Sequence, residues 1–222
     1  MTGNSYYYRK LHSLLGVIPV GFFLVEHLLT NYEAFRGGAD GHQSFIDKVH
    51  WLNNLPLVLI LEIVGIGLPI LYHGVYGLFV AFQARNNVSN YGYFRNVMFM
   101  LQRVTGVITL IFIVWHVWST RIQVALGHTT HDELGVLMHD IFTNPVTFTL
   151  YLIGVISSVF HFSNGMWSFL VSWGITVGPR AQRVSTYIWI GVFVAMSVMF
   201  VLTMTAFTDP QFSDTSVLDL NK

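Results

Sequence analysis

Long apolar stretches alternate along the chain with short polar ones. Each stretch has roughly the ~20 residues that a helix needs to cross a bilayer. This pattern predicts an all-α membrane protein with five transmembrane helices, in a single domain over residues 1–222. We expect the helices at about residues 12–30, 57–84, 96–120, 147–173 and 187–208. Pro19 lies inside the first of them and should kink it.

Composition supports a membrane protein. Of the 222 residues, 53% are hydrophobic and 10% are charged, whereas soluble domains carry about 25% charged residues. The chain has no cysteine, which excludes disulfides and thiolate-held metal sites within it. A formal net charge of zero argues against nucleic-acid binding. The polar, aromatic N-terminal segment is not expected to be a cleaved secretory signal.

Basic residues are distributed unequally between the two sides of the membrane. The segments before helix 1, between helices 2 and 3 and between helices 4 and 5 carry seven of them: Arg9, Lys10, Arg85, Arg95, Arg103, Arg180 and Arg183. The other side carries four: Arg36, Lys48, Arg121 and Lys222. This asymmetry predicts a cytoplasmic N-terminus and a C-terminus outside. The basic surface either reflects topology alone or docks an acidic cytoplasmic partner.

Four of the ten histidines lie deep in the predicted spans, one in each of the first four: His27, His73, His116 and His161. The helical rise places His27 and His116 near the outer face and the other two near the inner face, roughly 15 Å apart. One such histidine can be a packing residue, but four at matched depths favour a functional site. Zinc would need three or four converging ligands. Two facing pairs instead suit two haem irons, each bound from both sides.

Two glycines and an internal repeat fit the same interpretation. Gly77 and Gly165 each follow a histidine by four residues, so they would let a flat macrocycle approach the helix, although small-residue helix packing is an alternative. "LHSLLGVI" precedes His27 much as "LQRVTGVI" precedes His116, with Gly16 and Gly106 on roughly the faces of those histidines. We therefore expect helices 1–4 to form a pseudo-symmetric haem-binding four-helix bundle, with helix 5 outside.

The segments "RKLHSLLGVIPVGFFLVEH", "LPILYHGVYGLFVAF", "IVWHVWSTRIQVALG" and "FHFSNGMWSFLVSWGITVGPRAQRVSTY" resemble the dihaem cytochrome b subunit of succinate dehydrogenase. The resemblance is to the single-chain, five-helix anchors of menaquinone-using bacteria. It implies two haem b groups, the inner one ligated by His73 with His161 and the outer one by His27 with His116. It also implies a place in the bacterial cytoplasmic membrane, where the subunit anchors a flavoprotein and an iron–sulfur subunit on the cytoplasmic face.

In such a complex, electrons from succinate would pass through the two haems to menaquinone and the respiratory chain. The related quinol:fumarate reductases use a similar anchor in reverse, so the direction stays open, as does the oligomeric state of the complex. Glu62, early in helix 2, matches a carboxylate that serves quinol oxidation in those enzymes and is our candidate proton carrier. A snorkelling interfacial glutamate is the alternative. Glu26 either orients a ligand on a neighbouring helix or meets the interface.

Haem propionates are anionic and need cations or hydroxyl donors. The candidates on the inner side are Arg9, His12, Ser13, Arg103, Arg180 and Arg183, each of which could equally contact lipid headgroups or a partner. A haem-b subunit of another quinone-linked dehydrogenase is one rival reading, disfavoured by one histidine per helix. A metal or proton transporter is another, but it would need more intramembrane carboxylates than Glu26 and Glu62.

Overall fold

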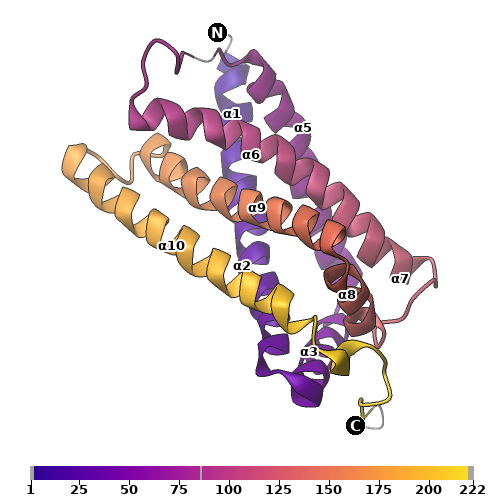
Figure 1. The fold of residues 1–222 in the computed structure, drawn as a ribbon. Coiled ribbons are helices and arrows are strands. Elements are labelled where there is room, and N and C mark those ends of the chain that lie inside the picture. Colours follow the sequence, from indigo (N-terminus) through magenta and orange to yellow (C-terminus); the bar gives the residue numbers. More distant parts are fainter. Residues whose placement is uncertain (1–2, 86, 220–222) are drawn as a thin grey trace. The chain divides into compact units, whose positions relative to one another are not determined.

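The computed structural model describes residues 3–85 and 87–219, and within these ranges it is helical, with no strand (Figure 1). Lys222, counted above among the basic residues, lies outside the described residues. Five helical segments are long and apolar enough to cross a membrane: Ser5–Arg36, Val58–Gln83, Phe94–Ala125, Pro145–Ser172 and Pro179–Ala206. The predicted fold class, an all-α membrane protein with five spans, is confirmed.

Three of the spans are built from more than one helical element. The first contains α1 (Gly3–Val17) and α2 (Pro19–Tyr32). The second contains α4 (Val58–Ile60), a π-helical turn η2 (Leu61–Gly67) and α5 (Leu68–Gln83). The third contains α6 (Phe94–Val117), a second π-helical turn η3 (Trp118–Ile122) and α7 (Gln123–Ala125). α1 and α2 are separated at Ile18, directly before Pro19, which lacks the N–H that a continuous ladder requires.

The last two spans are single helices, α9 (Pro145–Ser172) and α10 (Pro179–Ala206). Both begin with proline, which suits the first helical position because its missing N–H would be unpaired there anyway. Asn144 caps α9, since its Oδ1 accepts a hydrogen bond from the Val146 N–H at 2.9 Å. The turn between the two helices places Gly174 and Gly178 at φ 73° and 87°, a left-handed conformation that favours glycine.

The chain divides into two compact units, each made of three segments. Unit 1 contains Met1–Leu24, Leu59–Leu110 and Ile156–Ala195. Unit 2 contains Val25–Val58, Ile111–Val155 and Met196–Lys222. The boundaries fall inside helices, so that α2, α6, α9 and α10 each contribute residues to both units.

In unit 1, α1 packs against α5. Large apolar side chains on α5 are mostly exposed, with Leu71 61% and Val75 60% accessible, and α5 carries only one buried residue, Pro69. An apolar helix with so much exposed surface needs lipid or another protein around it.

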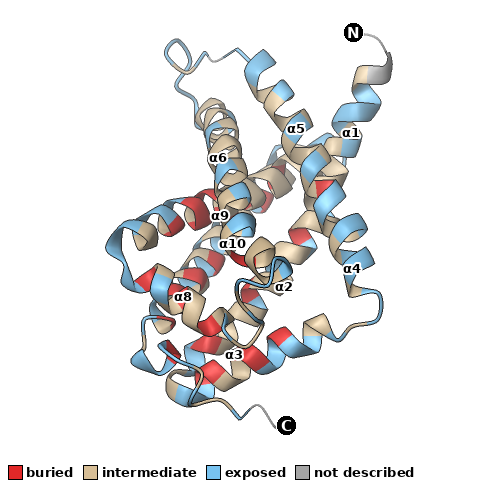
Figure 2. Cartoon of the chain, turned by 90° about the vertical axis from the view of Figure 1, so that its right-hand side faces the viewer, coloured by how far each residue is buried: buried red, intermediate tan, exposed pale blue. Residues whose placement is uncertain are grey.

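Unit 2 contains a small helical cap that the sequence pattern did not predict. Its elements are η1 (Glu33–Arg36), α3 (Gly38–Asn53), α8 (Leu134–Thr143) and the short η4 (Pro210–Phe212). α3 packs against η1, α8 and η4. Rings of Phe45, Phe207 and Phe212 form its centre, with centroids 5.0 Å apart for both Phe45–Phe207 and Phe207–Phe212. Buried positions on α3 and α8 are visible in red in Figure 2.

Candidate functional site

Unit 1 brings together the histidines of α5 and α9. The ring centres of His73 and His161 lie 6.0 Å apart, with the ring planes at 83°. Two imidazoles that bind one metal from opposite sides, each nitrogen about 2 Å from it, would have centres roughly 6 Å apart, so this spacing fits such a pair. Both histidines line a cavity of about 310 Å³. Among the described residues, no group of three or more His, Cys, Asp or Glu could hold a metal ion.

Backbone carbonyls fix the protonation pattern of these two rings. Nδ1 of His73 lies 2.8 Å from the His12 carbonyl oxygen, and Nδ1 of His161 lies 3.0 Å from that of Gln102. Because a carbonyl oxygen only accepts, Nδ1 must be the protonated nitrogen in each ring. The neutral imidazole then keeps its lone pair on Nε2, which is the arrangement of a histidine ready to bind a metal.

Gly16 and Gly106 make these two hydrogen bonds sterically possible. An added Cβ at Gly16 would lie 2.2 Å from Cε1 of His73, and one at Gly106 would lie 2.8 Å from Cε1 of His161. Each glycine stands four residues after the accepting carbonyl, and so on the same helix face. The two similar octapeptides therefore have the same role. Each supplies a carbonyl acceptor and a glycine gap for the imidazole of a histidine in the next span. The repeat predicts that these glycines lie on roughly the faces of His27 and His116, and the side chains that they contact are those of His73 and His161.

The two glycines predicted from the H-x-x-x-G pattern line the same cavity. A Cβ at Gly77 would lie 3.1 Å from Cε1 of His12, and one at Gly165 would lie 3.2 Å from Nε2 of Gln102. Side chains at either position would therefore crowd the cavity wall. The contacts fit a cradle for a flat ligand, and the role of both glycines toward a haem stays a prediction.

The six propionate candidates separate into two groups. His12, Ser13 and Arg103 line the cavity, whereas the described lining does not include Arg9, Arg180 or Arg183. The His12 ring stacks on His73, with centroids 4.0 Å apart and planes at 10°. Arg103 donates from Nε to the Phe99 carbonyl at 3.1 Å, and its guanidinium has further N–H groups for an anion.

Unit 2 contains the second predicted pair. The ring centres of His27 in α2 and His116 in α6 lie 5.8 Å apart, with the planes at 76°. Side chains surround these rings. Nδ1 of His116 lies 3.2 Å from the Tyr151 hydroxyl, and Nδ2 of Asn31 lies 3.4 Å from Nδ1 of His27 while donating to the His27 carbonyl at 2.7 Å.

Tyr151 is a residue that the sequence pattern did not single out. Its side chain is 2% exposed, and the rings of Phe112 and Trp115 pack against it with centroids at 5.2 Å and 4.9 Å. A buried tyrosine hydroxyl needs a hydrogen-bond partner, and His116 supplies one. The only sequence signal available was an aromatic residue inside a span, which usually indicates packing.

The two intramembrane carboxylates have different surroundings. Glu26 accepts a hydrogen bond from Thr30 Oγ1 at 2.6 Å within α2, so one of its oxygens is satisfied locally. Glu62 is half-buried in the π-helical turn η2, and it belongs to unit 1, whereas His27 and His116 belong to unit 2. Its role in quinone chemistry stays a prediction.

Two comparisons with known proteins agree with this architecture. The family model of the succinate dehydrogenase/fumarate reductase transmembrane subunit matches residues 83–200. The succinate dehydrogenase cytochrome b558 subunit of Bacillus subtilis (strain 168) is 50% identical to this chain over 208 residues, which cover 93% of this chain and 100% of that protein. A likeness of this extent covers nearly the whole chain.

Proposed function

The chain belongs to the family of transmembrane subunits of succinate dehydrogenases and fumarate reductases, and from this premise we propose that it anchors a succinate dehydrogenase and carries its electrons to menaquinone. The partners would be a flavoprotein and an iron–sulfur subunit, which bind the basic side of the anchor at the cytoplasmic face of a bacterial membrane. Succinate oxidation itself would take place in the flavoprotein. The extensive likeness to a succinate dehydrogenase subunit favours this direction over fumarate reduction.

The observation that carries the proposal is the His73–His161 pair in its glycine-lined cavity. In each ring Nδ1 donates to a carbonyl, so the neutral imidazole has its lone pair on Nε2 for a metal, and the ring centres are spaced for ligands on opposite sides of one iron. We assign one haem b to this pair and a second to His27 with His116, whose ring centres have nearly the same spacing. A bound haem b supplies a one-electron carrier.

The remaining polar groups of the cavity would balance the charge of haem propionates. Arg103 offers a permanent cation, and Ser13 and His12 offer smaller polar groups at the same wall. The Ser13 hydroxyl already accepts a hydrogen bond from Trp173 Nε1 at 2.9 Å, which leaves its own O–H to donate. Arg180 and Arg183 lie near the start of α10, and Arg9 lies in the second turn of α1. These three arginines suit docking of the soluble subunits better.

Glu62 would handle protons for menaquinone. Reduction of a quinone to a quinol takes up two protons, which a carboxyl group beside the quinone can deliver. The π-helical turn around Glu62 supports a functional role, because such turns are frequent at functional sites. The Glu62→Gln variant should lose quinone reduction while succinate still reduces the haems. Unchanged quinone reduction would remove Glu62 from the mechanism.

A redox titration of the purified complex tests the whole proposal. Two b-type spectral components per chain should appear, and succinate should reduce at least one of them. A complex with no haem bands would contradict the assignment of both histidine pairs. One component alone would restrict the assignment to a single pair, which the variants described below would identify.

A further inference from the structure

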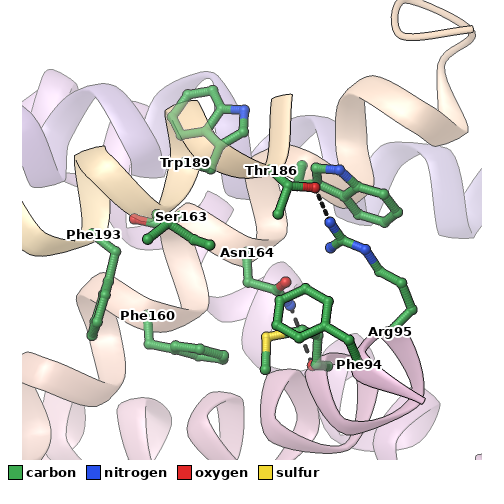
Figure 3. A pocket seen from close by; sticks show the side chains of 11 residues that line it. Phe94, Arg95, Phe160, Ser163, Asn164, Thr186, Trp189 and Phe193 are labelled. Atoms are coloured by element: carbon green, nitrogen blue, oxygen red, sulfur yellow. Dashed lines mark hydrogen bonds between the residues drawn. The ribbon is translucent and has the colours of Figure 1, made fainter. Parts of the chain in front are cut away.

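A second cleft lies in unit 1 on the opposite side of α9 from the histidine cavity. It is lined by residues of α6, α9 and α10 and measures about 50 Å³. Figure 3 shows the rings of Phe160 and Phe193 toward one end and Arg95 with Thr186 toward the other. The first is an apolar end and the second is a cationic one.

Arg95 is held in place without a carboxylate. Its guanidinium carbon lies 3.5 Å from the ring centre of Trp167, and it donates to the Thr186 hydroxyl. None of the described residues that line the cleft is Asp or Glu. A guanidinium has five N–H donors, more than one threonine hydroxyl can accept. The positive charge and several donors therefore remain for an anion.

Two more polar groups at the cleft lack partners. Ser163 is 2% exposed, and neither its Oγ nor Nε1 of Trp189 has a hydrogen-bond partner among the described residues. Leaving such groups buried and unpaired destabilises a protein. Both atoms lie beneath the cleft wall, whose surface is apolar, so the wall suits an acyl chain and Arg95 is the group that suits an anion.

We propose that this cleft binds one anionic phospholipid, with the phosphate at Arg95 and one acyl chain along the aromatic end. Arg95 is the second residue of α6 and Thr186 lies in the second turn of α10, near helix ends, where headgroups are found. The volume decides against a fully enclosed drug-sized ligand, since pockets for such ligands measure about 300–1,000 Å³. A lipid needs only part of one chain to enter. The site does not depend on the haem assignment.

Native mass spectrometry of the purified complex, stripped of lipid with detergent and then supplied with phosphatidylglycerol, tests the site. One phosphatidylglycerol per chain should be retained, at least tenfold more tightly than phosphatidylethanolamine, which has no net charge. Arg95→Gln should abolish that preference, while Arg85→Gln, which removes a charge from the same side of the membrane but lies outside the cleft, should not. Equal retention of both lipids, or an unaffected Arg95→Gln complex, would overturn the proposal.

A second variant tests the shape of the cleft separately from the charge of Arg95. Ile190 lines the cleft and is 46% exposed, so that Ile190→Trp fills the apolar end without disturbing the packed interior. It should lower phosphatidylglycerol retention at least tenfold although Arg95 is intact. If inorganic phosphate displaces the lipid and Ile190→Trp has no effect, the site binds a free anion only, and the lipid assignment is wrong.

Discussion

The two histidine pairs have nearly equal spacing but are held in different ways. In unit 1, backbone carbonyls accept the Nδ1 protons of His73 and His161, and glycines make room for the rings. In unit 2, the groups beside His116 and His27 are the side chains of Tyr151 and Asn31. The first arrangement repeats almost identically in two helix pairs, whereas the second has no such symmetry.

This difference determines which substitutions can disturb each site. A carbonyl acceptor survives every side-chain change, so the rings of unit 1 keep these two hydrogen bonds unless a glycine gap is filled or a histidine is removed. One side chain does contact a ring here, since Nε2 of Gln102 lies 3.2 Å from Nδ1 of His161. The rings of unit 2 depend on side chains and should respond to single hydrogen-bond deletions. The packing agrees, because aromatic rings fill the space around Tyr151 in unit 2, whereas unit 1 retains a cavity.

Removal of a proposed haem-ligating histidine should have the largest effect on haem content. His161→Ala or His73→Ala should lower the haem content from two per chain to one, and the remaining spectrum should belong to the His27–His116 pair. His128→Ala is the matched control, because His128 is exposed and is not among the residues that line the cavity. Haem extraction and low-temperature spectra would measure the outcome. Two haems in the His161→Ala or the His73→Ala variant would show the pairing to be wrong.

Filling a glycine gap should come next. Gly16→Ala and Gly106→Ala would push the imidazole away from its carbonyl, and overpacking of this kind costs about 1–3 kcal/mol, so the haem of unit 1 should bind at least tenfold more weakly. Gly191→Ala in α10 is the control, because a Cβ there meets nothing within 4 Å. Haem retention during dilution into a haem-binding acceptor would measure the effect. Equal retention by all three variants would contradict the steric role of the glycines.

Tyr151→Phe should change the potential of the second haem more than its occupancy. The variant deletes a neutral hydrogen bond worth about 1 kcal/mol, which corresponds to roughly 40 mV for a one-electron couple. Gln102→Leu should shift the potential of the unit 1 haem less, because the backbone carbonyl of residue 102 remains as the acceptor for His161. Potentiometric titration of both spectral components in each variant would measure the two shifts in potential. A larger shift from Gln102→Leu would reverse the contrast between the sites.

The smallest effect concerns the cap of unit 2. His42 is fully enclosed, and its Nδ1 lies 2.9 Å from the Gln211 carbonyl. Burial lowers the pKa of His42, although Gln211 and Asp214 oppose the shift. The pKa of His42 is therefore lower in the folded state than in the unfolded chain. The contribution of neutral His42 to the free energy of unfolding is complete above about pH 6.5. It is lost as the pH falls, by at most about 1.4 kcal/mol per pH unit.

Thermal unfolding of the purified complex between pH 8 and pH 5 would measure this dependence. A His42→Leu variant should have a lower melting temperature at pH 8 but a shallower decline toward pH 5. Parallel pH profiles of the melting temperature for the two proteins would exclude His42 as the source of the pH dependence.

Apolar run length was sufficient to predict the five spans, because a bilayer imposes one length on every crossing helix. It did not predict α3 and α8, because both are too short for that signal. They gain their stability from packing around Phe45, Phe207 and Phe212. The amphipathic spacing of Phe45, Ile46 and Val49 was the available clue.

The histidine pairs could be predicted from depth, since each histidine lies in a known span at a countable distance from its end. Their supporting groups could not. The carbonyl acceptors at His12 and Gln102 depend on which helix face meets which neighbour, and a carbonyl carries no sequence signal. Gly16 and Gly106 were visible as a repeat, but their contacts follow from helix rotation, which residue counting along one chain leaves open.

The two carbonyl bonds of unit 1 also set how far one helix can slide along another. Each joins consecutive spans, α1 to α5 and α6 to α9. A slip of one helical turn, about 5.4 Å, would carry each Nδ1–H away from its carbonyl and leave it in hydrocarbon, where an unpaired donor costs several kcal/mol. Neighbouring spans of unit 1 are thus aligned in height by the polypeptide alone, and His73 and His161, the proposed haem ligands, face each other without any bound ligand.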